Sequence, residues 1–158
     1  MESRFVVDSM LGKLARWLRI LGYSTIYDPK LNDDGLIEKG KEGWILLTSD
    51  EELSGRAFRD GVKVIKIEHG DITSQLIQVF KTLNLTPKPE EARCSLCNGL
   101  LVEIDIDEAE KKGYNIPPTV QTVWKCVECG HLYWKGSHWD NINRVVREIN
   151  SRLVRSDS

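Results

Sequence analysis

The sequence predicts an α/β protein in which a parallel β-sheet flanked by helices precedes a small cysteine module and a C-terminal helix. Three observations predict this class. Short apolar runs alternate with segments of helical periodicity over residues 1–86, as in sheets built from strand–helix–strand units. Two CxxC pairs follow a linker that contains two prolines. Apolar residues then recur at helical spacing after residue 137.

Four apolar runs are the predicted strands, and each is followed by a predicted helix. The runs read RFVVD, STIYD, WILLT and VKVIKI, and each is about five residues long. The helical segments cover residues 9–22, 33–42, 51–60 and 71–84. The first has leucines at positions 11, 14, 18 and 21 and ends at Gly22. Because the runs are almost continuously apolar, we expect helices on both faces of a parallel sheet.

Breaks in this pattern divide the 158 residues into a sheet domain over 1–86, a cysteine module over 87–136, and a helix and tail over 137–158. A hydrophobic content of 41% suffices for a core and argues against a disordered chain. A net charge of −2 argues against bulk electrostatic binding of nucleic acid, so any such contact needs a local basic stripe. Arg4 and Asp8 interrupt the first apolar run, and we therefore expect a cytoplasmic protein without a membrane segment.

The two CxxC pairs are the most specific signal in the chain. Cys94 and Cys97 form the first pair, and Cys126 and Cys129 form the second. Thiolates three positions apart at a tight turn can face one ion about 2.3 Å from each sulfur, and two such turns complete a tetrahedral site. Disulfides are unusual in the cytoplasm, and a redox site needs only one pair. We therefore predict structural zinc, with no position left open for chemistry.

Histidines and aromatic residues flank these cysteines. His131 and His138 lie nearby in the sequence, but four thiolates complete a site, so packing or hydrogen bonding is the simpler role for both. The aromatic residues are Trp124, Tyr133, Trp134 and Trp139. A small ribbon needs aromatics to fill a thin core, so we expect most of them inside and one or two as platforms for single-stranded bases.

Carboxylates follow three of the predicted strands. Asp8, Asp28 and Asp50 each stand at a strand end, and the pair Asp33 and Asp34 begins the helix after the second strand. The carboxyl ends of parallel strands share one edge of the sheet, and ligands bind outside that edge. Oxygen ligands gathered there favour Mg²⁺ or Mn²⁺. Such an ion can activate a water and stabilise a phosphodiester during hydrolysis.

A second interpretation gives each aspartate only a structural role. Asp is a favoured residue at the N-terminus of a helix, and every helix after a parallel strand begins at this same edge. Ser49 and Glu52 even fit a capping box, with Ser49 as the cap and Glu52 three positions on. The sequence leaves both interpretations open for each aspartate.

Basic residues step by three along the first helix. Lys13, Arg16 and Arg19 make a positive stripe that begins near the proposed acidic site. Charges in such a pattern commonly mark a solvated helix face. The functional interpretation is contact with phosphates, which positions nucleic acid without selecting its sequence.

Taken in order, these motifs resemble the mut-seven C-terminal RNase domain family. The resemblance rests on FVVDSMLGKLARWLRILGY, YDPKLNDDGLI, ILLTSDEEL, the two CxxC pairs and YWKGSHW, and it covers residues 4–145. It implies a PIN-like nuclease fold followed by a zinc ribbon. It also implies a metal-dependent ribonuclease that acts on single-stranded or structured RNA. The acidic positions carried over are Asp8, the pair Asp33 and Asp34, and Asp50.

The leading hypothesis is therefore a Mg²⁺- or Mn²⁺-dependent ribonuclease. Asp8, Asp34 and Asp50 hold the ion and an attacking water in this hypothesis. Lys13 and Arg16 grip phosphates, and the zinc ribbon presents the RNA or binds a protein partner.

Two other hypotheses remain. PIN nucleases commonly have a fourth acid after the next strand, where Glu68 and Asp71 are loose candidates. An incomplete cluster would leave a non-catalytic module that binds RNA or protein. Phosphoryl transfer on Asp8 or Asp50 ranks lowest, because the acidic partners that receiver and dehalogenase sites need near the first Asp are missing; position 10 is Met.

Overall fold

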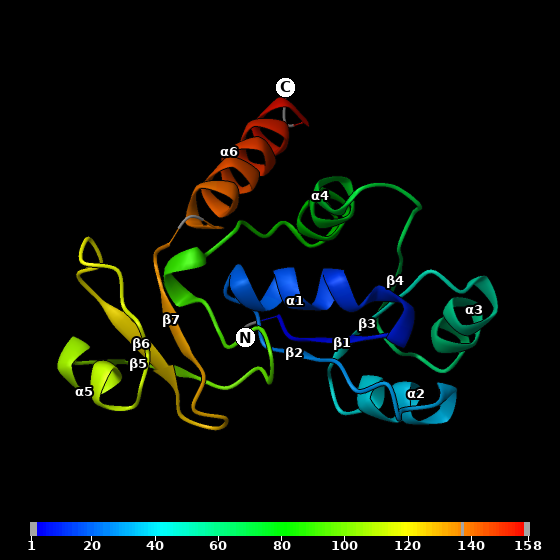
Figure 1. The fold of residues 1–158 in the computed structure, drawn as a ribbon. Helices are drawn as coiled ribbons and strands as arrows, with labels where there is room; N and C mark the ends of the chain where they lie inside the picture. The colour runs from blue at the N-terminus through cyan, green and yellow to red at the C-terminus, as the bar shows by residue number, and fades with distance from the viewer. Residues whose placement is uncertain (1–2, 137, 157–158) are drawn as a thin grey trace.

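The computed structural model describes residues 3–136 and 138–156, and its first half is a four-stranded parallel sheet (Figure 1). The strands lie in the order β2-β1-β3-β4. Their bounds are β1 Phe5–Val7, β2 Thr25–Ile26, β3 Ile45–Thr48 and β4 Val64–Lys66. The α/β prediction with a parallel sheet flanked by helices is confirmed.

Helices follow every strand of this sheet. The bounds are α1 Gly12–Ile20, α2 Asp33–Lys41, α3 Glu51–Arg59 and α4 Ile72–Leu83. Helices α1 and α4 cover one face of the sheet, and α2 and α3 cover the other (Figure 1). The segment predicted as one helix over residues 9–22 is two elements, because a short 3₁₀ turn, η1 (Ser9–Leu11), precedes α1.

The order of the strands creates a switch point between β1 and β3. The chain runs from β1 outward to β2, then crosses back to place β3 on the other side of β1. At such a point neighbouring helices lie on opposite faces, and the loops after the two strands diverge. Asp8 directly follows β1, and Asp50 follows β3 by two residues.

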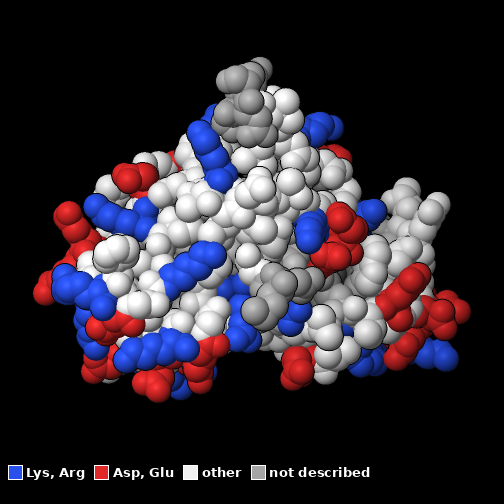
Figure 2. Space-filling view, turned by 180° about the vertical axis from the view of Figure 1, so that it is seen from behind, with Lys and Arg blue, Asp and Glu red and all other residues white. Residues whose placement is uncertain are grey.

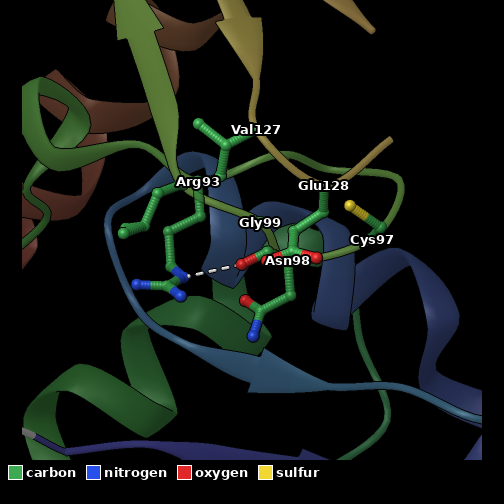
Figure 3. A pocket seen from close by; sticks show the side chains of 7 residues that line it. Arg93, Cys97, Asn98, Gly99, Val127 and Glu128 are labelled. Atoms are coloured by element: carbon green, nitrogen blue, oxygen red, sulfur yellow. Dashed lines mark hydrogen bonds between the residues drawn. The ribbon is translucent and has the colours of Figure 1, made fainter. Parts of the chain in front are cut away.

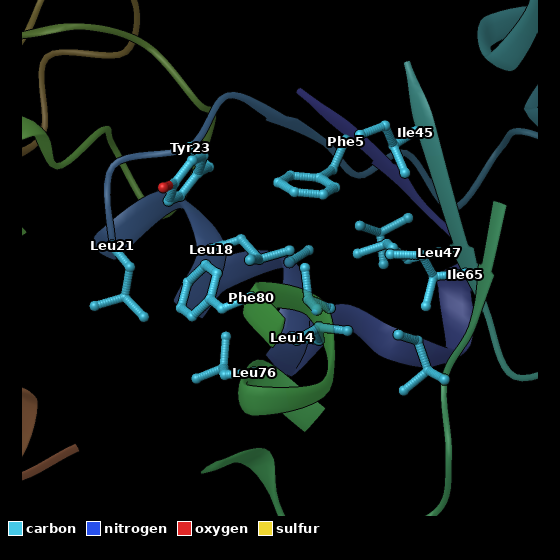
Figure 4. Close-up of a cluster of buried hydrophobic side chains, with 14 of the residues drawn as sticks. Phe5, Leu14, Leu18, Leu21, Tyr23, Ile45, Leu47, Ile65, Leu76 and Phe80 are labelled. Atoms are coloured by element: carbon cyan, nitrogen blue, oxygen red, sulfur yellow. The ribbon is translucent and has the colours of Figure 1, made fainter. Parts of the chain in front are cut away.

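Alternate strand residues fill two hydrophobic layers. Phe5 and Val7 of β1 pack with α1 and α4, whereas Val6 packs with α2 and α3. In the first layer the ring of Tyr23 lies 6.0 Å from that of Phe5 and 5.6 Å from that of Phe80, measured between centroids (Figure 4). This pattern explains why the strands are apolar throughout, since both faces of each strand are covered.

The second half of the chain begins with a three-stranded antiparallel ribbon in the order β5-β6-β7. A short 3₁₀ turn, η2 (Pro89–Glu91), precedes it, and a short helix, α5 (Ile106–Lys111), lies between its first two strands. The strands are β5 Leu101–Ile104, β6 Val123–Cys126 and β7 Leu132–Trp134. Helix α5 was not predicted.

Helix α6 (His138–Ser156) completes the fold. Its side chains Val145 and Ile149 are buried in the same layer as α1 and α4, so the last helix packs on the sheet domain rather than on the ribbon. The C-terminal helix was predicted from residue 137, and that residue lies outside the described ranges. Among the residues that the structure describes, no helix has the length and apolar character needed to span a bilayer.

Candidate metal centres

The four cysteines meet at one point between the ribbon and the sheet domain. Their sulfur atoms all lie within 4.8 Å of one another. Cys94 Sγ lies 3.7 Å from Cys129 Sγ, and Cys97 Sγ lies 3.4 Å from Cys126 Sγ. Four sulfurs placed about 2.3 Å from a tetrahedral ion are about 3.8 Å apart, so the observed spacing fits a metal ion such as zinc.

Each pair of cysteines sits in a tight turn, which we call the first knuckle (residues 94–99) and the second knuckle (residues 126–130). Gly130 has a φ of 79° in the second knuckle, but in the first it is Asn98, with a φ of 75°, rather than Gly99, that takes the left-handed conformation. Gly99 is needed for space, because a Cβ there would lie 2.6 Å from Cys126 Sγ. Both glycines therefore shape the site, for different reasons.

Backbone amides of the second knuckle point at the Cys126 sulfur. The N–H groups of Glu128 and Cys129 lie 3.4 and 3.5 Å from it. Burial of the Cys126 thiol opposes ionisation, but these amides and the neighbouring thiols outweigh it and lower the pKa of Cys126 to about 7. A thiol that ionises near neutral pH is prepared to bind a metal.

The histidine and aromatic predictions have different outcomes. The ring of His131 packs edge-on against that of Tyr133, 4.7 Å between centroids, and His131 is absent from the metal-ligand group of the described residues. The Tyr133 hydroxyl lies 3.0 Å from Cys94 Sγ, and burial raises the pKa of Tyr133 to about 12. Trp134 packs against the small ribbon core, whereas Trp139 lies under the ammonium group of Lys135.

A second polar centre lies at the switch point of the sheet. Asp8 is half-buried, and its Oδ2 accepts a hydrogen bond of 2.8 Å from the Thr48 hydroxyl. The same Thr48 oxygen accepts the backbone N–H of Asp50 at 3.1 Å. The fully buried Thr48 thus joins the Asp8 side chain to the backbone of Asp50. Sequence reasoning missed Thr48; its polar side chain at the end of an otherwise apolar run was the available signal.

The structure separates Asp8 from Asp50 with respect to the two interpretations that the sequence left open, a helix cap or a ligand. Asp50 caps α3, because its Oδ1 accepts the N–H groups of Glu52 and Leu53 at 2.9 and 3.1 Å. The cap is therefore Asp50 and not Ser49. Asp8 precedes η1 but makes no side-chain hydrogen bond to cap it. The Asp8 side chain therefore does not cap η1, and its carboxylate contacts Thr48 instead.

The remaining acidic candidates lie on exposed loops and helix starts. Asp34 forms an ion pair with Arg56 of α3, and Asn32 rather than Asp33 caps α2. Asp28 Oδ1 accepts the backbone N–H of Lys30 at 3.0 Å. Within the described ranges, the cysteine quartet is the one group of three or more metal-binding side chains whose ligand atoms all lie within 4.8 Å. Asp8, Asp34 and Asp50 do not form such a group.

The candidates for a fourth acid stand after β4. Glu68 is exposed, and Asp71 caps α4 by accepting the Ser74 N–H at 2.8 Å. This hydrogen bond lowers the pKa of Asp71. Asp71 therefore has a structural role that fully accounts for its position at the start of α4.

Comparison with models of known protein families shows which family the chain belongs to. The model of the Mut7-C RNAse domain matches residues 3–146, nearly the whole chain. This chain belongs to the Mut7-C RNAse domain family. The resemblance seen in the sequence is thereby confirmed, and the family indicates a nuclease or RNA-related function. No curated protein and no solved structure matches the chain significantly.

The basic stripe of this Mut7-C chain contains two exposed residues, not three. Lys13 and Arg16 are exposed on α1, but Arg19 has only 5% of its surface accessible. Its Nε donates to the Thr25 carbonyl at 3.0 Å, and its Nη1 donates to the Ser95 carbonyl at 2.9 Å. Burial lowers the pKa of Arg19. The interpretation of Arg19 as an RNA contact is therefore corrected, because its guanidinium is enclosed by the first knuckle.

Arg19 belongs to a polar seam that joins the Mut7-C sheet domain to the first knuckle. Asn98 accepts the Thr25 N–H at 2.9 Å and donates to the Ser24 hydroxyl at 3.0 Å. The backbone N–H of Arg93 donates to the Arg19 carbonyl at 2.8 Å. These bonds attach the cysteine ribbon to the loop before β2, at the edge of the sheet opposite to Asp8. We call this set of contacts the seam.

Proposed function

We propose that this Mut7-C protein is a divalent-metal-dependent ribonuclease that hydrolyses RNA phosphodiester bonds. Its sheet is a PIN-like nuclease sheet in this proposal, and the active site lies at the carboxyl edge between β1 and β3. The observation that carries the proposal is the Asp8 carboxylate, which is half-buried at the switch point and caps no helix. A half-buried carboxylate that caps no helix and accepts a single hydroxyl hydrogen bond is available to bind a cation.

The donor set at this edge fits Mg²⁺ or Mn²⁺. Asp8 and Asp50 offer only oxygen, and Asp50 uses Oδ1 for its cap, which leaves Oδ2 free of any bond to the described residues. Asp34 is the third proposed ligand, and it joins the others if its ion pair with Arg56 opens. Because that pair is exposed, it opens at little cost. An ion bound here would supply an activated water and neutralise charge on the phosphate.

The protein groups have separate tasks in this proposal. Thr48 fixes the rotamer of Asp8 and ties it to the start of α3, so that two carboxylates keep one spacing. Lys13 and Arg16 bind phosphates of the RNA strand next to the cleaved bond. Neither has an ion-pair partner among residues 3–136 and 138–156. Asp28 and Asp33 follow β2, at the carboxyl edge of the sheet, and are alternative ligands in this proposal.

Local cations matter because the surface as a whole is not basic. On the face shown in Figure 2, Lys and Arg side chains alternate with Asp and Glu side chains around the edge of the molecule. A net charge of −2 agrees with this view. RNA binding by this chain therefore depends on a few residues, and its salt slope should be about one unit for each of those cations.

We also propose that the ion of the cysteine quartet is zinc and that its role is structural. Four sulfurs complete the coordination and leave no open position. Four cysteines that form no disulfide favour a reducing compartment such as the cytoplasm.

End-labelled RNA tests the main proposal. The zinc-loaded protein should shorten a single-stranded RNA when Mn²⁺ or Mg²⁺ is added, and Asp8→Asn should not. Asn retains an oxygen that accepts the Thr48 hydroxyl, so the variant should keep its fold. Equal cleavage by Asp8→Asn and the unaltered protein would exclude the acidic edge as the active site.

A second candidate function is binding of RNA without cleavage. It is favoured by two observations: Asp8, Asp34 and Asp50 form no group of three ligands in the part of the chain described, and Asp34 is paired with Arg56. This candidate predicts RNA retention on a filter that falls with salt. It also predicts that no divalent ion leads to shortening of the strand.

A further inference from the structure

A hollow of about 410 Å³ lies beside the first knuckle (Figure 3), and none of the acidic-edge residues Asp8, Asp34 and Asp50 lines it. Leu100 and Val127 line it, and they are 57% and 54% exposed. The Val127 N–H donates to the Leu100 carbonyl at 3.0 Å, which keeps the two side chains side by side. Exposed apolar side chains paired at the mouth of a hollow offer a surface for a flat, apolar group.

Arg93 brings a positive charge to this hollow. Its backbone N–H is bonded to Arg19, and its Nε donates to the Asn98 carbonyl at 2.9 Å (Figure 3). Both Nη atoms of Arg93 lack a hydrogen-bond or ion-pair partner among the described residues. One nitrogen therefore holds the guanidinium in place, and the other two are available as hydrogen-bond donors. Two such donors can bind one phosphate together.

Helix α1 connects this hollow to the acidic edge. It begins four residues after Asp8 and ends beside the seam, and its nine residues span about 14 Å. Lys13 and Arg16 lie exposed along it, and Arg93 follows at its far end through the bond to Arg19. Lys13 and Arg16 thus lie on the helix that runs from the proposed cleavage site to the residue bonded to Arg93.

We propose that the hollow is a second RNA subsite, which holds one nucleotide of the strand about a helix length from the cleaved bond. Arg93 binds its phosphate, and Leu100 and Val127 contact its base. The carboxylate of Glu128, at the opposite rim, can accept from an amino group of the base. This inference rests on the proposed ribonuclease function and gives it a substrate class, an extended single strand.

The exposed cations of α1 favour RNA over a protein segment as the occupant. A peptide seated in the hollow would contact Leu100 and Val127 but would have no connection to Lys13 and Arg16, which bind the RNA strand in the proposed function. In this proposal one extended RNA strand engages all three cations. Single strands also expose base faces to apolar side chains, which duplexes do not.

The length of the RNA provides the test. A dinucleotide fills the cleavage site but cannot also reach the hollow, whereas a much longer single strand can. Arg93→Gln should lower the affinity for the long strand, measured by fluorescence anisotropy without added Mg²⁺ or Mn²⁺, by about tenfold. It should reduce the salt slope by about one. Cleavage of the dinucleotide in Mn²⁺ should not change.

Two further variants control this test. Val127→Asp leaves the bond from Arg93 to Asn98 intact and should weaken binding of the long strand, because its carboxylate repels phosphate. Arg144→Gln removes an exposed arginine of α6, bonded to Asn141 of its own helix, and should have no effect. Zinc content and Tm confirm that each variant is folded.

The outcomes separate this inference from the proposed function. Affinity for the long strand that stays at the level of the unaltered protein in both Arg93→Gln and Val127→Asp would overturn the subsite and leave the hollow to a protein partner. Equal losses on dinucleotide and long strand would also overturn it, since the effect would then come from the fold. If those variants behave normally while Asp8→Asn abolishes cleavage, only the subsite is wrong.

Discussion

The sheet domain and the cysteine ribbon are stabilised in different ways. Among the described residues, the larger layer of the sheet domain buries sixteen hydrophobic side chains, including two from α6. The core of the ribbon buries four: Ala109, Ile116, Val123 and Leu132. Even with the four partly buried hydrophobic side chains that pack against it, this core is small for a module of that size. We therefore expect the ribbon to depend on a bound metal and the sheet domain not to depend on it.

The comparison also separates two uses of metal in one chain. In the ribbon, four cysteine sulfurs are placed to enclose an ion, and we propose that this ion holds the fold together. At the sheet edge, the oxygen ligands of the proposed ion are half-buried or exposed. A catalytic ion needs such an open site, because the substrate must reach it. The seam of Arg19 and Asn98 is the place where the two regions depend on each other.

Removing the zinc should have the largest effect. A chelator, or Cys126→Ser, should unfold the ribbon, and amide hydrogens of β6 should lose protection from exchange. Amides of β1 and β3 should remain protected, because the hydrophobic layers hold them. Loss of protection in both regions together would mean that the two modules form a single cooperative unit.

Truncating a core side chain should destabilise the sheet domain and leave the ribbon unchanged, the opposite of metal removal. Phe80→Ala should lower the free energy of unfolding of the sheet domain by about 3–5 kcal/mol, because Phe80 is fully buried. The zinc content of the folded protein should not change. Phe58→Ala is the matched control, since Phe58 is 79% exposed and its loss should shift stability by less than about 0.5 kcal/mol.

Breaking the seam should have an intermediate effect. Asn98→Gly keeps the left-handed backbone but removes the bonds to Ser24 and Thr25, at a cost of about 1–3 kcal/mol. Exchange of the Thr25 amide hydrogen should become faster. Asn84→Gly is the control, because Asn84 is also left-handed but lies at the end of α4, where its side chain makes no bond to other described residues.

Substitutions at Asp50 separate the cap from the charge. Asp50→Ala should cost about 1 kcal/mol of stability by removing the cap of α3, whereas Asp50→Asn should be close to neutral. Both should lose cleavage, which requires the charge. Thermal unfolding measures the loss of the cap, and RNA cleavage by the same preparations measures the loss of the charge. Full activity in Asp50→Asn would mean that Asp50 only caps the helix.

The smallest effect concerns pH. The pKa of Asp71 is lowered in the folded chain by the Ser74 N–H, so this carboxylate contributes stability above its unfolded pKa. That contribution is lost as the pH falls through the folded value. Asp71→Asn still caps α4 but cannot ionise, so its stability should fall less steeply in acid. Unfolding curves over the acidic range would show whether the two slopes differ.

Much of this architecture was predictable because it follows from local patterns. Continuous apolar runs placed β1 and β3, and the spacing of the cysteines predicted their cluster. The fate of Arg19 was not predictable, since its burial depends on Ser95, which lies 76 positions away. The link through Thr48 was missed for the same reason, because it requires the register of β1 against β3. Helix periodicity reports one face of one helix and does not reveal what covers it.

Binding of Mn²⁺ to the zinc-loaded protein tests most directly whether the sheet edge is a second metal centre. Electron paramagnetic resonance of free Mn²⁺ measures this binding without RNA or turnover. We expect the unaltered protein to bind Mn²⁺ with its zinc retained and Asp8→Asn to lose that binding while keeping its zinc and its Tm. Mn²⁺ binding of equal strength in the two proteins would contradict the account.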